Sequence, residues 1–530
     1  MDSERTWPVL VYTLLIMKTT LTQHEINRRE LLRWAVVASA LMSPVGKVFA
    51  ASATEVKVLL GRPTDTSIAV SVMSTKKINA FIEYGTSKTK YSAKSPVQEI
   101  EPGTPAIFDL TKLRANSKIY YRVSFTDSGS KSVVRGKQSS FVTQRNPGSP
   151  FVFTAHGDTH PERKGKMFNE ALYKVALANI LSHQPDFHIM MGDDFSIDPL
   201  ISKGQANKAN VEKVYLTHRQ WLEAIGGSVP LFLVNGNHEQ AAAYLLDGTL
   251  TNPAVLAGSA RVKYFPLPAP DGFYTGDKVQ IDGVGLLRDY YAWEWGNALF
   301  VVLDPYWHSK KPVDNVAGDT SGDNTSESST ATAGAKGQKK NQNSGTAGSG
   351  GSGAGKTANQ WEIGIGDEQY FWLKETLEKS AATFKFVFAH HVMGTGRGAI
   401  EISENYEWGG KDPKGSTTFK EQRPNWDLPI HDLMVKNKVS IFFQGHDHIF
   451  VTQERDGLIY QALPNPADDT FSMFNESAYK SGVKAPNSGH IRVSVSPSEA
   501  KVEYFLAARK EDSGRKNLQL AHSYTVKPKQ

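Results

Sequence analysis

The sequence of 530 residues contains no cysteine. Disulfide bonds and thiolate metal sites are therefore excluded, and any metal ion would have to be held by histidine, aspartate, asparagine or glutamate. No run of lysine and arginine interleaved with aromatic residues is present, which argues against nucleic-acid binding. The net charge of +6 is small for this length, so it indicates only a weak attraction for anionic substrates or envelope surfaces.

The N-terminal segment lacks an apolar run long enough to cross a bilayer comfortably, because the run at 34–42 is too short. This run follows the pair Arg28 and Arg29 and leads to small residues around Ala50. The pattern resembles a twin-arginine export signal with cleavage near Ala50 or Ala51. We therefore expect residues 1–51 to be an N-terminal extension with an export signal. The mature protein would then be periplasmic or secreted, without stable membrane insertion.

Two alternatives stay open for this segment. It could be an uncleaved anchor, or an amphipathic first helix that contains two arginines by chance. The stretch before Met17 has an apolar patch of its own, and we expect the true start of translation at Met17.

A chain of 530 residues exceeds what one compact core usually contains, so we expect at least two domains. Within 52–146, short segments that alternate polar and apolar residues are separated by turn residues. This pattern predicts a small all-β sandwich that carries no residues for chemistry. Its clearest strands are expected at 56–60, 67–72, 80–84 and 118–123.

Residues 147–527 show a different pattern, in which continuous apolar runs alternate with segments of helical periodicity. Such runs indicate buried strands covered by helices, that is, an α/β domain. Helices are expected at 169–181 and 369–377, and buried strands at 151–153, 187–191, 231–234, 299–303, 384–388 and 439–443. The stretch 315–360 consists mostly of small and polar residues, which predicts a disordered low-complexity insertion.

Five of the predicted buried strands are each followed by a short cluster of polar residues that can bind metal ions. In an open α/β sheet, loops at the carboxyl ends of the strands gather in one crevice, so these clusters are expected to converge. A glycine before most of the clusters lets the backbone turn sharply off the strand. One cluster could arise by chance, whereas five in the order of the strands indicate a shared site. The clusters are Gly157-Asp158-Thr159-His160, Gly192-Asp193-Asp194, Gly236-Asn237-His238-Glu239, Ala389-His390-His391 and Gly445-His446-Asp447-His448.

These residue types suit the hydrolysis of a phosphate ester. The reaction needs a hydroxide near neutral pH and neutralisation of charge on the phosphate oxygens, and two metal ions about 3.5–4 Å apart supply both. A carboxylate can bridge the two ions, imidazoles can fill the outer positions, and a neutral amide oxygen limits the total negative charge. The sequence therefore predicts a dinuclear metal site.

The motifs, in their order, resemble those of the calcineurin-like metallophosphoesterase superfamily, over roughly residues 150–510. The resemblance implies an α/β (α+β) metallophosphoesterase fold, in which two packed mixed β-sheets are flanked by helices. The preceding β-sandwich is similar, more weakly, to the fibronectin-like N-terminal domain of purple acid phosphatases and of alkaline phosphatase D-type enzymes.

The resemblance also implies roles for individual residues. A metal-bridging hydroxide would attack the phosphate in line with the leaving alcohol, and His238 would assist as general acid or hydrogen-bond donor. The metal ions would come from iron, manganese or zinc, with cobalt and magnesium as further candidates. Asp193 would bridge both ions. The ligands of the first ion would be Asp158, His160 and His448, and those of the second Asn237, His390 and His446.

Two positions depart from the pattern of related enzymes. Purple acid phosphatases carry a tyrosine three residues after the bridging aspartate, where this chain has Ser196, so we expect no purple colour. Val392 replaces the usual proline after the fourth motif, which leaves His391 as an alternative ligand to the favoured His390. Arg397 is the first choice for a cation that binds the substrate, with a solvated loop arginine as the alternative.

The leading hypothesis is an exported phosphatase that acts on a small phosphomonoester. A phosphodiesterase or nuclease of the same fold is the close alternative, because it would share the metal ligands. An envelope protein that binds metal without catalysis is a third interpretation, which the complete ligand set disfavours. Neither the substrate, the pH optimum nor the oligomeric state follows from the sequence.

Overall fold

The computed structural model describes residues 54–313, 360–392, 397–412 and 414–529. The predicted export signal and the alternative start at Met17 lie outside the described residues. So does the low-complexity insertion, apart from Gln360. Within the described part of the chain, no helix combines the length and the apolar character that a membrane crossing requires.

Two large mixed sheets form the centre of the fold. The nine-stranded sheet contains, in spatial order, β25 (Leu520–Val526), β24 (Ala500–Leu506), β23 (Gly489–Val495), β10 (Phe151–His156), β11 (Phe187–Met190), β12 (Leu231–Leu233), β1 (Val56–Gly61), β2 (Ile68–Ser74) and β6 (Ala106–Leu110). The eight-stranded sheet contains β13 (Thr275–Gly276), β16 (Tyr291–Trp295), β17 (Ala298–Val302), β18 (Phe384–Phe388), β19 (Ile441–Gln444), β21 (Leu458–Ala462), β20 (Phe450–Arg455) and β22 (Val483–Ala485). A short hairpin of β14 (Gln280–Ile281) and β15 (Gly285–Leu286) stands apart from both.

The main core lies between these two sheets and is rich in phenylalanine. Phe153 of β10 and Phe187 of β11 both pack against Phe300 of β17, with ring centroids 5.1 Å apart in each pair. Burial of a side chain of this size contributes roughly 1.5–3 kcal/mol. The continuous apolar runs of the sequence therefore become strands that are buried by a second sheet on one face and by helices on the other.

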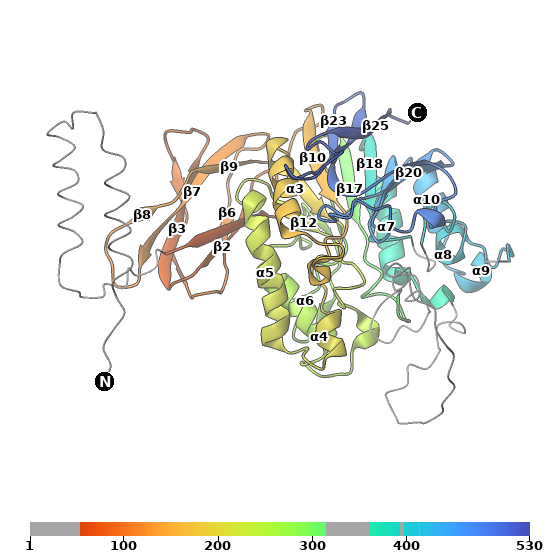
Figure 1. Cartoon of the computed structure of the whole chain (residues 1–530), viewed down its shortest axis with the longest axis horizontal. Coiled ribbons are helices and arrows are strands. Elements are labelled where there is room, and N and C mark those ends of the chain that lie inside the picture. Colours follow the sequence, from red (N-terminus) through yellow and green to blue (C-terminus); the bar gives the residue numbers. More distant parts are fainter. Residues whose placement is uncertain (1–53, 314–359, 393–396, 413, 530) are drawn as a thin grey trace, which may run out of the picture. The chain divides into compact units, whose positions relative to one another are not determined.

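Helices cover the outer face of each sheet. Apolar residues of α3, α5 and α6 pack against the nine-stranded sheet, while α7 and α10 pack against the eight-stranded sheet, and Figure 1 shows these two groups on opposite sides of the strands. The helices are α3 (Glu170–Ser182), α4 (Asp198–Ser202), α5 (Lys208–Gly226), α6 (Pro253–Tyr264), α7 (Gly366–Lys379), α8 (Tyr406–Gly409), α9 (Phe419–Gln422) and α10 (Ile430–Lys436). The helices predicted at 169–181 and 369–377 correspond to α3 and α7.

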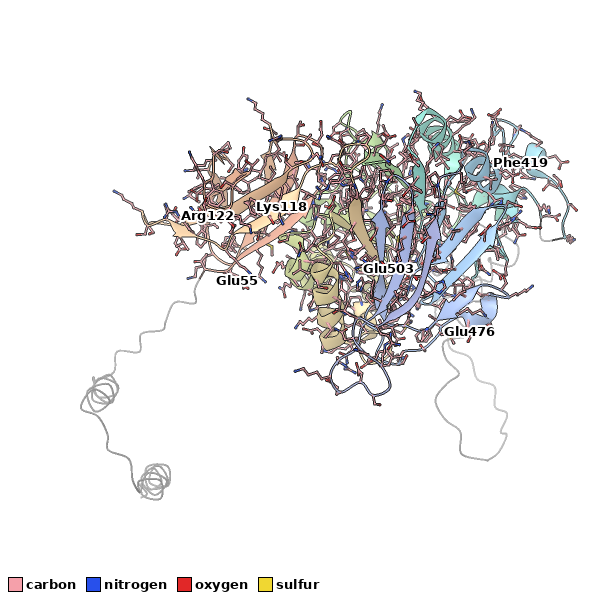
Figure 2. All side chains as sticks on the ribbon, turned by 90° about the horizontal axis from the view of Figure 1, so that it is seen from above. Glu55, Lys118, Arg122, Phe419, Glu476 and Glu503 are labelled. Carbon is pink, nitrogen blue, oxygen red and sulfur yellow. The ribbon has the colours of Figure 1, made fainter. Side chains whose placement is uncertain are left out.

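The N-terminal β region forms a second, smaller core. Strands β1, β2 and β6 pack against a six-stranded sheet, in which Lys118 and Arg122 lie on β7 (Figure 2). The strands of that sheet are β3 (Ile78–Gly85), β4 (Ala93–Lys94), β5 (Gln98–Ile100), β7 (Lys118–Asp127), β8 (Val134–Arg135) and β9 (Ser139–Val142). β1 also pairs in parallel with β12 through Gly61 and Leu231, so one sheet is continuous across the predicted boundary near residue 146. The exact domain limits stay a prediction.

The strands that precede the polar clusters run parallel to one another. β10, β11 and β12 are parallel neighbours in the nine-stranded sheet, and β17, β18 and β19 are parallel neighbours in the eight-stranded sheet. Their carboxyl ends therefore lie at one edge of each sheet, where loops can carry polar side chains without disturbing the core.

Candidate metal centre

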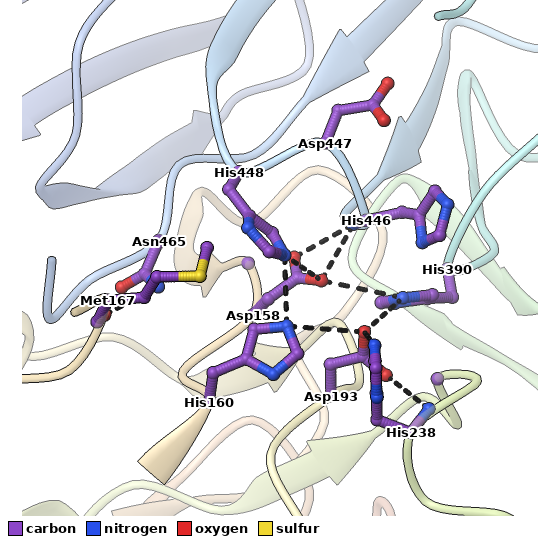
Figure 3. A network of polar contacts seen from close by, with 12 residues as sticks. Asp158, His160, Met167, Asp193, His238, His390, His446, Asp447, His448 and Asn465 are labelled. Carbon is purple, nitrogen blue, oxygen red and sulfur yellow. Dashed lines mark hydrogen bonds and ion pairs between the residues drawn. The ribbon is translucent and has the colours of Figure 1, made fainter. Parts of the chain in front are cut away.

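The five polar clusters converge at the carboxyl ends of β10, β11, β12, β18 and β19. Figure 3 shows histidine and aspartate side chains from these loops pointing toward one another, whereas Asp447 points away. The predicted ligands are all buried, with exposed fractions between 0 and 3%. The convergence expected from the sequence is therefore present in the structure.

A first group consists of Asp158, His160, Asp193 and His448, whose ligand atoms all lie within 4.8 Å of one another. The Nε2 atoms of His160 and His448 face each other at 3.0 Å. His448 Nε2 lies 3.4 Å from Asp158 Oδ1, and His160 Nε2 lies 3.6 Å from Asp193 Oδ2. Two imidazoles and two carboxylates thus surround one point, as the ligands of a metal ion do.

A second group consists of Asp193, His390 and His446 and shares the carboxylate of Asp193 with the first. His390 Nε2 lies 3.1 Å from Asp193 Oδ2. His390 Nδ1 donates a hydrogen bond to the carbonyl of Met191 at 2.6 Å, which leaves Nε2 as the atom that can bind a metal ion. Its neighbour His391 is not in the group; its Nδ1 lies 3.1 Å from the hydroxyl of Tyr306.

Buried polar atoms that lack hydrogen-bond partners show whether these residues fit two cations. Both side-chain amide atoms of Asn237 are buried and have no hydrogen-bond partner. Asp193 Oδ2 makes no hydrogen bond either, although imidazole nitrogens lie 3.1, 3.6 and 4.0 Å away. Leaving such groups without partners is costly, and coordinated cations would satisfy the two oxygens, Asn237 Oδ1 and Asp193 Oδ2. The donor set of imidazole, carboxylate and amide oxygen fits a dinuclear centre.

The ligand loops adopt backbone conformations that side chains rarely take. The φ angles of His160, Asp193, His446 and His448 are 47°, 58°, 66° and 50°. A left-handed conformation costs a residue with a Cβ roughly 1–2 kcal/mol, and such residues concentrate at functional sites. Hydrogen bonds hold the loops in place, since the amide of His446 donates to both oxygens of Asp158 at 3.0 and 2.9 Å.

Glycine is required at two of the positions that precede a ligand. A Cβ atom at Gly236 would lie 2.2 Å from Asp193 Oδ1, and one at Gly445 would lie 2.7 Å from Asp158 Oδ2. Any larger residue would therefore displace a carboxylate of the site. This is a steric reason that adds to the turn predicted from the sequence.

The charges of the site act strongly on one another. Burial opposes ionisation of Asp193, but the charge of His390 holds the pKa of this carboxyl well below its usual range. Burial also works against the charged form of His390, yet the charge of Asp193 raises the pKa of this imidazole to about 10. Burial lowers the pKa of His160 and of His446. Bound cations favour ionised carboxylates and neutral imidazoles, which are the ligand forms.

His238 lies at the edge of the two groups and is the most accessible of these imidazoles. Its side chain is 12% exposed, and its Nε2 lies 4.0 Å from Asp193 Oδ2. Its Nδ1 is hydrogen-bonded to Asp198 Oδ2. Burial lowers the pKa of His238, but the charges of Asp193 and Asp198 outweigh it and raise the pKa to about 9. The imidazole thus lies beside the shared carboxylate, with its Nδ1 bonded to Asp198.

Three residues near the site were not singled out from the sequence. Asp198 is the first residue of α4 and is hydrogen-bonded to His238. Glu162 Oε1 accepts a hydrogen bond from His160 Nδ1 at 2.8 Å. Arg163 Nη2 lies 3.3 Å from His238 Nε2. No motif marks Asp198, because its contact depends on how α4 packs. Glu162 and Arg163 directly follow a cluster and could have been considered for that reason alone.

Several other polar residues in or near the clusters hold the loops in place through hydrogen bonds. Glu239 accepts hydrogen bonds from backbone amides and none from the imidazole of His238. Asp194 Oδ1 accepts a hydrogen bond from Thr159 at 2.7 Å, and His156 Nδ1 donates to the carbonyl of Gly157 at 2.6 Å. Arg397 donates to the carbonyl of His446 at 2.6 Å; its role in binding substrate stays a prediction.

Comparison with known proteins agrees with this fold. The sequence model of the calcineurin-like phosphoesterase family matches residues 151–450, more than half of the chain. Among solved structures, PhoD aligns with a TM-score of 0.58 and 13% identity, over 89% of this chain and 90% of its own. A purple acid phosphatase from yellow lupin (Lupinus luteus) seeds aligns with a TM-score of 0.55 and 14% identity, over 89% of this chain and 74% of its own. No curated protein matches the chain.

The fold and the site thus define a metallophosphoesterase, and the predicted fold class is confirmed. The chain belongs to the calcineurin-like phosphoesterase family. It is a metal-dependent phosphoric ester hydrolase with a candidate site for two metal ions.

Proposed function

We propose that the protein is an exported phosphatase that uses two metal ions to hydrolyse phosphomonoesters. The observation that carries this proposal is the carboxylate of Asp193, which belongs to both groups of ligand atoms and lies beside His238. The first ion would be held by Asp158, His160 and His448, the second by Asn237, His390 and His446, and Asp193 would bridge them.

The chain's own residues would orient the substrate and move a proton. When bound, the two cations would acidify a water molecule and neutralise charge on the phosphate oxygens. His238 would hold a proton at Nε2 and give it to the oxygen of the leaving alcohol. Asp198, bonded to Nδ1, would hold the orientation of the ring and stabilise its protonated form. The partial exposure of His238 would let a substrate reach it.

A monoester is favoured over a diester by the charge near His238. Arg163 lies 3.3 Å from His238 Nε2 and also contacts Glu162, with 3.4 Å between Nε and Oε1. A phosphomonoester carries more negative charge than a diester, so a guanidinium at this position would contribute more to its binding.

The identity of the metal ions is proposed from the donor set. Imidazole and carboxylate ligands accommodate iron, manganese and zinc, and also cobalt or magnesium. Ser196 stands where purple acid phosphatases have a tyrosine, so iron bound here would lack the purple colour. Elemental analysis of protein purified without chelator, together with its visible spectrum, tests both statements.

Activity assays separate the proposed function from its alternatives. The purified protein, with and without added Mn²⁺, is given p-nitrophenyl phosphate and bis-p-nitrophenyl phosphate. We expect faster hydrolysis of the monoester. Preference for the bis ester would instead favour a phosphodiesterase or nuclease, and hydrolysis of neither ester by metal-replete protein would favour a non-catalytic metal-binding protein.

Export is proposed from residues 1–51 alone. Replacing both Arg28 and Arg29 by lysine should retain the protein in the cytoplasm, because a twin-arginine signal depends on the arginine pair. Cell fractionation checks this, and unchanged export of the double variant would contradict the proposed route.

A further inference from the structure

A third group of potential metal ligands lies outside the dinuclear site. It consists of Asp277, Asp289 and His308, whose ligand atoms all lie within 4.8 Å of one another. Asp277 directly follows β13, Asp289 precedes β16, and His308 lies in the turn after β17. Three segments at one edge of the eight-stranded sheet therefore contribute one ligand each.

The backbone holds the two aspartates together. β13 and β16 are antiparallel neighbours, and the amide of Asp277 donates to the carbonyl of Tyr290 at 3.1 Å. Asp289 Oδ2 accepts a hydrogen bond from His308 Nε2 at 2.7 Å. The ligand oxygens of Asp277 and Asp289 lie within 4.8 Å of each other. The group is thus preformed by sheet pairing.

Each of the two carboxylates has one partnered oxygen and one without a partner: Asp277 Oδ1 accepts a hydrogen bond from the amide of Val279 at 2.8 Å, and Asp289 Oδ2 is bonded to His308. Asp277 is 1% exposed and Asp289 is 0% exposed. Asp277 Oδ2 and Asp289 Oδ1 have no hydrogen-bond partner. Among the described residues, neither carboxylate forms an ion pair with lysine or arginine, and His308 supplies at most one positive charge. Two buried negative charges facing one imidazole require a further proton or a cation.

We propose that Asp277, Asp289 and His308 bind a third divalent cation, separate from the dinuclear centre. Two carboxylate oxygens and one imidazole nitrogen are a ligand set suited to Zn²⁺ or Mn²⁺, with water completing the coordination. Ca²⁺ is disfavoured, because it prefers sites built from oxygen atoms alone.

The cation would be structural, because it would join the two aspartates beside β13 and β16 to the turn after β17. In that turn, Asp304 Oδ1 accepts hydrogen bonds from the amides of Tyr306 and Trp307 at 2.7 and 3.2 Å. Asp304 Oδ2 accepts a hydrogen bond from Asn235, two residues before Asn237. Metal binding at the third site would therefore stabilise a segment that supports the dinuclear centre.

Metal counting on the full chain tests the proposal. The variant Asp277→Asn keeps the size of the side chain and removes one charged ligand. We expect it to bind about one metal ion fewer per chain than the wild type, whatever the occupancy of the dinuclear centre. Asp282→Asn is the matched control, because Asp282 is exposed in the turn between β14 and β15 and makes the same change of charge. It should bind as much metal as the wild type.

A shared proton is the competing arrangement, and the same variant distinguishes it. Without a cation, the amide introduced by Asp277→Asn would donate a hydrogen bond to Asp289 and replace the proton, so metal content and thermal stability would both stay at wild-type values. That outcome would overturn the proposal. If Asp277→Asn folds poorly, His308→Gln serves as the second variant, because it keeps a donor to Asp289 and removes the imidazole ligand.

The Asp193→Asn background separates this proposal from the proposed function. In Mn²⁺-loaded Asp193→Asn, the third site should still give the resolved hyperfine signal of a bound, isolated Mn²⁺ in electron paramagnetic resonance, and adding Asp277→Asn should lower this signal by about one Mn²⁺ per chain. An unchanged signal in the double variant would refute the third site. Loss of metal only from the dinuclear centre would leave it standing.

Discussion

Glu239 provides a test of how the ligand loops are held together. The residue is 1% exposed, and its carboxylate accepts four hydrogen bonds from backbone amides. Oε1 accepts from Asp194 at 2.7 Å and Phe195 at 2.9 Å, and Oε2 accepts from Gly236 at 2.7 Å and Asp193 at 3.0 Å. The side chain thus ties the loop after β11 to the loop after β12.

The variant Glu239→Gln preserves the shape of this side chain but not its acceptors. One oxygen remains, while the other becomes an amide nitrogen that faces two backbone amides. Two buried N–H groups then lack an acceptor, at roughly 1–3 kcal/mol each, so the expected loss of stability is about 2–6 kcal/mol. No cavity is created, so the loss can be attributed to the hydrogen bonds.

Denaturant unfolding of the metal-free protein measures this loss without a contribution from bound metal. Glu421→Gln is the matched control, because Glu421 is exposed and the change is chemically the same. We also expect a lower metal content for Glu239→Gln, since Asp193 and Asn237 lie on the two loops that it joins. Wild-type stability together with wild-type metal content would refute the reasoning, because it would mean that the carboxyl group is already neutral.

Three further predictions concern the candidate metal centre and its surroundings. In Asp193→Asn, metal content and turnover should fall together in elemental analysis and phosphatase assays, and full activity with only one ion lost would contradict a bridging role. In His238→Ala, metal content should be retained while kcat falls by about 10²–10⁴, because a proton donor is lost; equal loss of metal would point to a ligand instead. Arg163→Ala should raise KM for p-nitrophenyl phosphate more than for the bis ester, whereas Lys166→Ala, an exposed cation nearby in the sequence, should change neither; an equal change in KM for both esters with Arg163→Ala would argue against the proposed phosphate contact.

Much of the fold follows from local pattern. The runs around Phe153, Ile189 and Phe386 are apolar at nearly every position, which marks strands covered on both faces. Phe153 and Ile189 lie in parallel strands of the nine-stranded sheet, and Phe386 lies in a parallel strand of the eight-stranded sheet. The continuation of the nine-stranded sheet through β1 was not expected, because it depends on a single backbone pairing between Gly61 and Leu231. Such a pairing leaves no signature in either segment.

The sequence by itself determined the family, the fold class and the positions of the candidate ligands, because short polar motifs directly after buried strands are local features. Only the tertiary structure decided how those groups are supported. Asp198 forms a hydrogen bond with His238, Glu239 accepts hydrogen bonds from the amides of the loop after β11, and Asp277 lies beside Asp289 and His308 through packing and sheet pairing. These contacts join separate segments of the chain, and their energies depend on burial and distance, which no local pattern encodes.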